Sequence, residues 1–257
     1  MKKAPIIIFT TISILFFSVV CNADSPIRPK SRFYSSQNGK FVFVLLISDS
    51  ELEVLRNLLE FDKKNLQNSS VPPHKRKGIE AKLDTEFLRE LKLRERYRTS
   101  GLFWRGNPQK LLWSYDWKYG QLILGGDIKV ANDGIHLVQK NGWISRKPYE
   151  NEPDWNQEVL SFISSGKKIR SYRAGDLVLK NEKLEGTASG YYWNRGDGYL
   201  NNKNNTFTIR KVNGEKLTFS TNTGDLISGK EDFRLRRSLT TACTRPESAC
   251  LSCKSCW

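Results

Sequence analysis

Apolar residues along this chain follow two patterns, one continuous and one with helical spacing. The segment from Phe41 to Ile47 is apolar throughout, rich in β-branched and aromatic residues, and directly follows the turn sequence Gln37–Lys40. A run without polar interruption is typical of a strand buried on both faces. We therefore predict a core strand at this position.

Helical spacing begins immediately afterwards. A first helix is expected between Ser48 and Pro72, where leucines recur at helical spacing after a Ser-Asp-Ser-Glu sequence that favours a helix N-terminus. A second is expected from about Ile79 to Arg98, with an apolar residue at every fourth position. The basic segment 74–77 is expected to lie in the loop between them. Residues 51–98 are therefore predicted to be a helical insertion.

Beyond residue 100, short β-like segments are separated by turn dipeptides. Asp133-Gly134 and Asn213-Gly214 are the clearest hairpin turns, because Asp, Asn and Gly accept positive φ angles. This alternation of short strand-like segments and turns predicts an antiparallel meander. The expected strands are Leu102–Arg105, Leu111–Trp117, Asp127–Ala131, Ile135–Gln139, Glu158–Ile163, Lys168–Tyr172, Thr206–Lys211 and Lys216–Thr221.

Three turn-and-strand phrases, at residues 37–42, 132–138 and 212–217, are similar to one another. They also resemble the phrase that recurs in β-propeller blades, although their spacing is not that of single blades. The predicted fold class is mainly β: an antiparallel meander forming a two-sheet sandwich, or a small or incomplete propeller, with a two-helix insertion. The sandwich is favoured because no blade signature repeats.

The first 23 residues have the pattern of a secretory signal peptide. Lys2 and Lys3 precede an apolar run at 6–20, which spans 15 residues, fewer than the ~18 expected of a membrane-spanning helix. Cleavage after Ala23 would leave an exported protein without a permanent membrane span. Lipidation of Cys21 is the alternative, and the residues before it match a lipobox poorly.

The remaining chain is predicted to be one β domain followed by a tail, because its composition is that of a folded protein. The chain has 257 residues, 38% of them apolar and 11% aromatic, which is too apolar for a disordered protein. The expected organisation is a signal peptide at 1–23, a β domain at 24–237 that contains the insertion at 51–98, and a cysteine-containing tail at 238–257.

The strong positive charge indicates the class of partner. Lys and Arg number 42 against 27 Asp and Glu, a formal charge of +15, and removal of Lys2 and Lys3 leaves +13. Outside the cytoplasm, such a charge favours an anionic envelope polymer, a carbohydrate or a protein. Nucleic acid is not expected, because the basic residues of the insertion are interspersed with nearly as many acids and lack interleaved aromatics. The oligomeric state is not predicted.

Four cysteines close the chain with the spacing C-x6-C-x2-C-x2-C, at Cys243, Cys250, Cys253 and Cys256. An even number of cysteines in an oxidising compartment favours two disulfides, with three possible pairings. Structural zinc sites usually separate two C-x2-C pairs by a dozen or more residues, and an iron–sulfur motif would need a further cysteine followed by Pro. We therefore predict disulfides and neither a metal nor a cofactor.

An aromatic stripe is the other candidate binding feature. On a strand, Trp113, Tyr115 and Trp117 would share one face. Pointing inward they would belong to the core, and pointing outward they would form a platform for sugar rings. The tryptophans at 104, 143, 155 and 193 are scattered and are expected to fill the core.

No catalytic residue is predicted. His74 lies in the basic loop and His136 in a strand, and no Gly-x-Ser-x-Gly sequence accompanies either of them. The carboxylates Glu150, Glu152 and Asp154 precede Trp155, and Asp116 stands between two aromatic residues. A pair of these acids would be needed for a glycosidase, and sequence alone does not place them.

Segments 112–117, 133–138 and 166–172 together resemble uncharacterised exported bacterial proteins. The resemblance implies an exported, β-rich protein in the periplasm or outside the cell, and it carries no functional residues. The predicted function is non-enzymatic binding of an anionic or carbohydrate-rich partner. The alternatives are an envelope-acting hydrolase that uses paired carboxylates and a propeller-like scaffold for protein partners.

Overall fold

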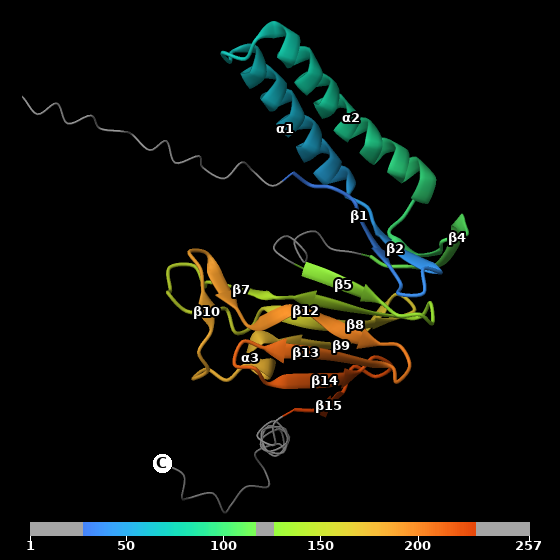
Figure 1. Ribbon diagram of the computed structural model, residues 1–257, viewed down its shortest axis with the longest axis vertical. Coiled ribbons are helices and arrows are strands. Elements are labelled where there is room, and N and C mark those ends of the chain that lie inside the picture. The colour runs from blue at the N-terminus through green and yellow to red at the C-terminus, as the bar shows by residue number, and fades with distance from the viewer. Residues whose placement is uncertain (1–27, 117–125, 230–257) are drawn as a thin grey trace, which may run out of the picture.

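The computed structural model describes residues 28–116 and 126–229, and it confirms a mainly β fold with antiparallel sheets and a two-helix insertion. Three of its four sheets are four-stranded (Figure 1), and we call them the first, middle and last sheets. The first comprises β1 (Arg32–Ser35), β2 (Phe41–Leu45), β3 (Gly101–Trp104) and β4 (Asn107–Ser114). The middle comprises β5 (Gly126–Val130), β6 (His136–Asn141), β8 (Glu158–Ser164) and β9 (Lys167–Arg173).

The last sheet comprises β12 (Asn194–Asn201), β13 (Thr206–Lys211), β14 (Lys216–Ser220) and β15 (Leu226–Ser228). A small sheet of β10 (Glu185–Gly186), β11 (Gly190–Tyr192) and β7 (Trp143–Ser145) flanks the stack, and α3 (Ala174–Leu177) is a single turn. The segments predicted as strands from residue 126 onwards match these bounds within two residues. The sequence prediction did not include β1, β7, β10, β11, β12 or β15, and β4 begins four residues before the predicted Leu111.

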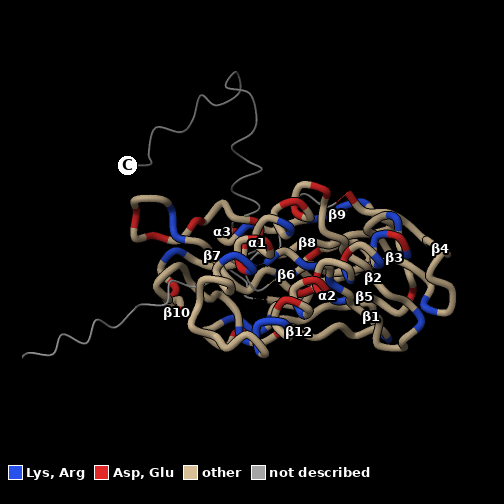
Figure 2. The backbone as a smooth tube through the Cα atoms, turned by 90° about the horizontal axis from the view of Figure 1, so that it is seen from above, with Lys and Arg blue, Asp and Glu red and all other residues tan. Residues whose placement is uncertain are grey.

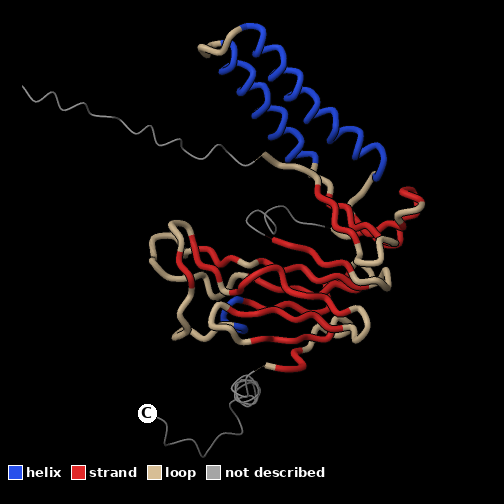
Figure 3. Tube along the Cα trace, in the orientation of Figure 1, coloured by secondary structure: helices blue, strands red, loops and turns tan. Residues whose placement is uncertain are grey.

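The middle sheet is covered on both faces, so the three sheets form layers (Figures 1 and 3). Neighbouring residues on β6 show this, because Leu137 packs toward the first sheet and Val138 toward the last. Successive side chains of a strand point to opposite faces, so both must be apolar in a central layer. The β part is therefore a sandwich extended to three layers.

Strand β2 is buried at all five positions, as its continuous apolar run predicted. Phe41, Phe43 and Leu45 pack toward the middle sheet. Val42 and Val44 pack on the opposite side against the end of the helical hairpin. This outer face of the first sheet, partly covered by a helix, positions the candidate site described below.

The helical insertion is an antiparallel hairpin of α1 (Asp49–Gln67) and α2 (Pro73–Tyr97). Ser48 caps α1 as expected, accepting a 3.2 Å bond from the Glu51 backbone N–H, while the Glu51 carboxylate accepts one of 2.6 Å from the Ser48 N–H. Helix α2 begins six residues earlier than the predicted Ile79, so segment 74–77 is helical rather than a loop. A proline is well tolerated in a first helical turn, where no N–H is required. Within the described residues, no helix has the length and apolar character needed to cross a bilayer.

The three similar turn-and-strand segments all form hairpin turns, but these turns differ in their position within their sheets. The first two form the turns between β1 and β2 and between β5 and β6, each opening its sheet. The third forms the turn between β13 and β14, in the middle of the last sheet. The turn that opens the last sheet is Asn202–Asn205, which contains no glycine and has Asn205 at a φ of +50°.

Candidate functional site

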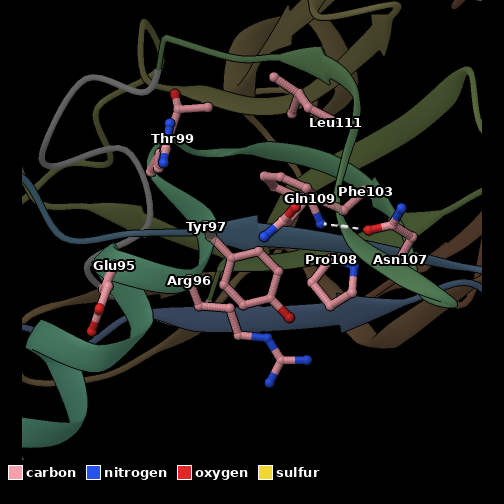
Figure 4. Close-up of a pocket in the computed structure, with 10 residues that line it drawn as sticks. Glu95, Arg96, Tyr97, Thr99, Phe103, Asn107, Pro108, Gln109 and Leu111 are labelled. Atoms are coloured by element: carbon pink, nitrogen blue, oxygen red, sulfur yellow. Dashed lines mark hydrogen bonds between the residues drawn. The ribbon is translucent and has the colours of Figure 1, made fainter.

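A groove runs between the C-terminal end of α2 and the outer face of the first sheet (Figure 4). A cavity of about 700 Å³ and a second of about 230 Å³ both touch Arg96, Tyr97 and Pro108. Figure 4 shows Tyr97 and Pro108 side by side at the centre, with Glu95 and Arg96 extending from the helix. We call the two cavities together the basic groove, lined by Phe33, Ser35, Val42, Glu95, Arg96, Tyr97, Arg98, Thr99, Phe103, Trp104, Arg105, Asn107, Pro108, Gln109 and Leu111.

Tyr97 fixes the groove in place because it anchors the helix to the sheet. Its ring centroid lies 5.0 Å from that of Phe103 and 5.8 Å from that of Phe33. Val42 and Val44 complete the buried cluster beneath it. The Tyr97–Phe103 pair is edge-to-face and the Phe33–Tyr97 pair is tilted, and aromatic pairs contribute ~1 kcal/mol each beyond their burial.

The chain reverses direction directly after Tyr97. Arg98 has a φ of +48°, in the left-handed region, and its N–H bonds to the Arg94 carbonyl at 2.9 Å. Its ψ of −33° differs from that of the left-handed cap that commonly ends a helix, so the chain leaves α2 through a strained turn. This turn presents the side chains on either side of the helix end to one cavity.

The opposite wall comes from the β3–β4 hairpin at the edge of the first sheet. Pro108 is tolerated there because the outer side of an edge strand needs no N–H donor. Trp104, expected in the core, is instead 37% exposed at the rim, and Phe33 is 40% exposed. The ring of Trp104 packs against Phe41 on one side and carries Lys110 Nζ at 5.9 Å on another.

Four cations surround the groove without neutralising partners. Arg96 lies over the Tyr97 ring at 5.3 Å, Arg98 and Arg105 line the cavities, and Lys110 sits by Trp104. Across the two described stretches of chain, none of these four makes an ion pair with a carboxylate. One carboxylate, Glu95, also lines the larger cavity.

Within the described residues, some cations of the hairpin are ion-paired and others, such as Lys75 and Lys77, are exposed without an ion pair. The groove differs because its unpaired cations lie beside cavities and exposed rings. Arg94, two residues from Arg96, is ion-paired with Asp49, and Lys63 bridges Glu60 and Asp84 at 2.8 Å each. Figure 2 shows basic and acidic residues interspersed over most of the chain. Unpaired guanidinium groups beside exposed rings can bind carboxylate, sulfate or phosphate oxygens bidentately while the rings contact an apolar face.

The predicted aromatic stripe is divided by the structure. Trp113 and Tyr115 pack, partly buried, against the core between the first and middle sheets, and Trp113 Nε1 donates a 3.0 Å bond to the Gly134 carbonyl. Burial raises the pKa of the Tyr115 hydroxyl. These two side chains take the inward orientation that the sequence left open. Trp117 lies outside the described residues, as do Cys21 and all four of Cys243, Cys250, Cys253 and Cys256.

The candidate catalytic groups have ordinary structural partners. His136 Nδ1 lies 2.6 Å from Asp133 Oδ2 within the β5–β6 hairpin. Lys147 Nζ lies 2.9 Å from Glu150 and 3.9 Å from Glu152 at the surface. Among the described residues, no three His, Cys, Asp or Glu side chains are placed to hold a metal ion.

Sequence reasoning considered Arg96 and Arg98 only as part of an ordinary salt-bridged helix face, and it placed Trp104 in the core. The alternation of Arg94, Arg96 and Arg98 with other residues at a helix end was the available signal. It could not separate paired from unpaired cations, because Asp49, which binds Arg94, lies 45 residues away along the chain.

No family model, curated protein or solved structure matches this chain.

Proposed function

We propose that the protein is exported and binds an anionic or carbohydrate-rich partner of the envelope or extracellular space, without turnover, through the basic groove. One observation carries this proposal: four cations surround two cavities, and within the described chain none of the four has a carboxylate partner. The opening segment and the resemblance to exported bacterial proteins support the export.

The physical basis is long-range attraction followed by specific contact. A formal charge of +13 after removal of the opening segment draws polyanions toward the protein. In contact, unpaired guanidinium groups gain charge-assisted hydrogen bonds without first breaking an internal ion pair. The rims formed by Trp104 and Phe33 add apolar contact area. Because surface electrostatics are screened by salt, affinity should fall steeply with ionic strength.

The test compares two triple variants of equal charge by titration with polygalacturonate, with neutral dextran as the reference polymer. The first, Arg96→Gln/Arg98→Gly/Arg105→Gln, removes cations from the groove. The second, Lys75→Gln/Lys77→Gln/Lys82→Gln, removes three exposed lysines from α2 away from the groove.

The groove variant should lose at least about tenfold in affinity, equivalent to ~1.4 kcal/mol, and the lysine variant should lose less than about twofold. Equal losses in both would mean that binding follows net charge alone, and the proposal would fail. Dextran binding as tight as that of polygalacturonate would mean that the groove binds carbohydrate without using charge, which would contradict the role proposed for its four cations. The signal-peptide prediction is tested separately by the N-terminal sequence of the secreted protein.

A further inference from the structure

The outer face of the last sheet carries three cations in direct register. Arg195 on β12 pairs with Arg210 on β13, and Arg210 pairs in turn with Lys216 on β14. All three are exposed. We call them the cation row, which crosses three adjacent strands about 4.8 Å apart.

The alternation of each strand shows that the row points away from the core. Phe207, Ile209, Leu217 and Phe219 fill the interior between the middle and last sheets. Their neighbours along β13 and β14 therefore face outward. In Figure 1 the last sheet lies at the end of the stack opposite the helical hairpin, so the cation row is remote from the basic groove.

A parallel row of hydroxyl groups lies beside the cations on the same face. Tyr199 pairs with Thr208, Thr208 with Thr218, and Thr218 with Ser228. The Thr208 and Thr218 hydroxyls are 3.0 Å apart, and Tyr199 is 61% exposed. The two rows together offer cations, hydroxyls and one aromatic ring, and they contain no aliphatic side chain.

Like charges directly opposite on neighbouring strands repel and destabilise a sheet. Within the described residues, the one carboxylate paired with this row is Glu185, 3.0 Å from Arg195, in an ion pair exposed to solvent. Such an exposed pair is weak. Among residues 28–116 and 126–229, no carboxylate forms an ion pair with Arg210 or Lys216, so an external polyanion would relieve their repulsion.

We propose that this face is a second binding site, for an acidic polysaccharide laid across the strands with its acidic groups on the cation row and its hydroxyls on the threonine row. The inference shares the partner class of the proposed function but rests on a different surface. A polysaccharide is favoured over a lipid surface because membrane binding draws on inserted apolar side chains, which the two rows lack. It is favoured over a simple anion because the hydroxyl row matches hydroxyl-rich sugars.

The first experiment uses the full chain and polygalacturonate, with its methyl-esterified, neutral form and phosphatidylglycerol vesicles as comparison probes. Arg210→Gln/Lys216→Gln removes the unpaired cations. Lys180→Gln/Lys203→Gln removes two exposed lysines from loops and is matched in charge. The cation-row variant should lose about tenfold in affinity for the acidic polymer and the control less than about twofold. Equal affinities of the two variants, or vesicle binding in preference to the polymer, would overturn the inference.

A second variant tests the hydroxyl row. Thr208→Val/Thr218→Val keeps a well-packed β-branched pair while removing both hydroxyls. A sugar-specific site should lose about threefold to fivefold in affinity for polygalacturonate, within the range expected of one lost hydrogen bond. An unchanged affinity would indicate a purely electrostatic surface and would contradict the inference. The groove triple variant leaves this face intact, so it should retain some binding of polygalacturonate. That remaining binding should disappear when Arg210→Gln/Lys216→Gln is added. The combined variant therefore separates failure of one site from failure of the other.

Discussion

The backbone N–H of Asn38 donates a 2.9 Å hydrogen bond to Asn132 Oδ1, and Asn38 Nδ2 donates a 3.2 Å bond to the Asn132 carbonyl. The two residues are 94 positions apart and lie in the turns that open the first and middle sheets. These two bonds, both donated by Asn38, tie the two sheets together at their turn ends. The turn that opens the last sheet joins them, because Asn202 Oδ1 accepts a 2.7 Å bond from the Asn132 N–H and Asn202 Nδ2 donates a 3.1 Å bond to Gln37 Oε1.

Asn202→Ala should destabilise the stack by ~1–2 kcal/mol, since it removes two hydrogen bonds and leaves a half-buried N–H without its acceptor. The midpoint of urea unfolding should fall while the slope stays unchanged. Asn204→Ala, in the same turn and exposed, is the control and should remain near wild type. Equal midpoints for the two variants would mean that the turns do not hold the sheets together.

Lys211→Met should be more costly, by ~3 kcal/mol, because it removes one partner of a buried ionic cluster. The Lys211 side chain is 2% exposed, and its Nζ lies 2.6 Å from Glu182 Oε1 and 3.1 Å from Glu215 Oε2. Lys216→Met, on the outward face of the neighbouring strand, should stay within ~0.5 kcal/mol or gain slightly as repulsion in the cation row falls. Thermal unfolding compares the two, and a similar loss in both would contradict the burial argument.

Asp133 should contribute stability that depends on acid pH. Burial alone would raise the pKa of its carboxyl group, but hydrogen bonds from the His136 side chain and from the N–H groups of His136 and Ile135 outweigh burial and lower the pKa. The folded pKa therefore lies below the unfolded one, so the contribution is complete above pH ~4 and is lost as pH falls through the folded value. Asp133→Asn should reduce the free energy of unfolding at neutral pH and make it depend less on pH in the acid range. Urea titrations between about pH 2 and pH 6, a range that brackets both the folded and the unfolded pKa, measure this dependence. An unchanged slope would show that the carboxylate is not the group responsible.

Arg98 allows backbone strain to be separated from binding. The positive φ of Arg98 lowers the stability of the folded protein by ~1–2 kcal/mol relative to an unstrained residue. Glycine would remove this strain but would lose ~0.5–1 kcal/mol of stability through its larger entropy loss on folding. Arg98→Gly should thus be as stable as wild type or up to ~1 kcal/mol more stable, whereas Arg98→Ala keeps the strain. Both should weaken polygalacturonate binding by the same factor, because both remove the guanidinium. Calorimetric unfolding and polymer titration of the two variants give the comparison, and unequal affinities would place the effect in the backbone instead.

Elements whose burial follows from neighbouring residues in the chain could be predicted from the sequence. The unbroken apolar run of β2 required a strand buried on both faces, and Ser48 with Glu51 specified where the first helix starts. Strands such as β13, where Thr206, Thr208 and Arg210 alternate with buried residues, were also found, because period-two alternation records which face is covered. Strand β12 was missed, since Gly196 and Gly198 both have positive φ and interrupt its register with β13, which leaves no alternation to recognise.

The two surfaces on which binding is proposed could not be predicted from the sequence, because they form only when distant segments pack together. Arg96 and Arg105 reach one groove because Tyr97 docks the helix onto the first sheet. Arg195 and Lys216 lie on either side of Arg210 because β12 and β14 both pair with β13. Both arrangements depend on cross-strand register and on which carboxylates lie within reach. These are long-range properties, set by the packing of segments far apart in the chain, and hydrophobic periodicity does not predict them.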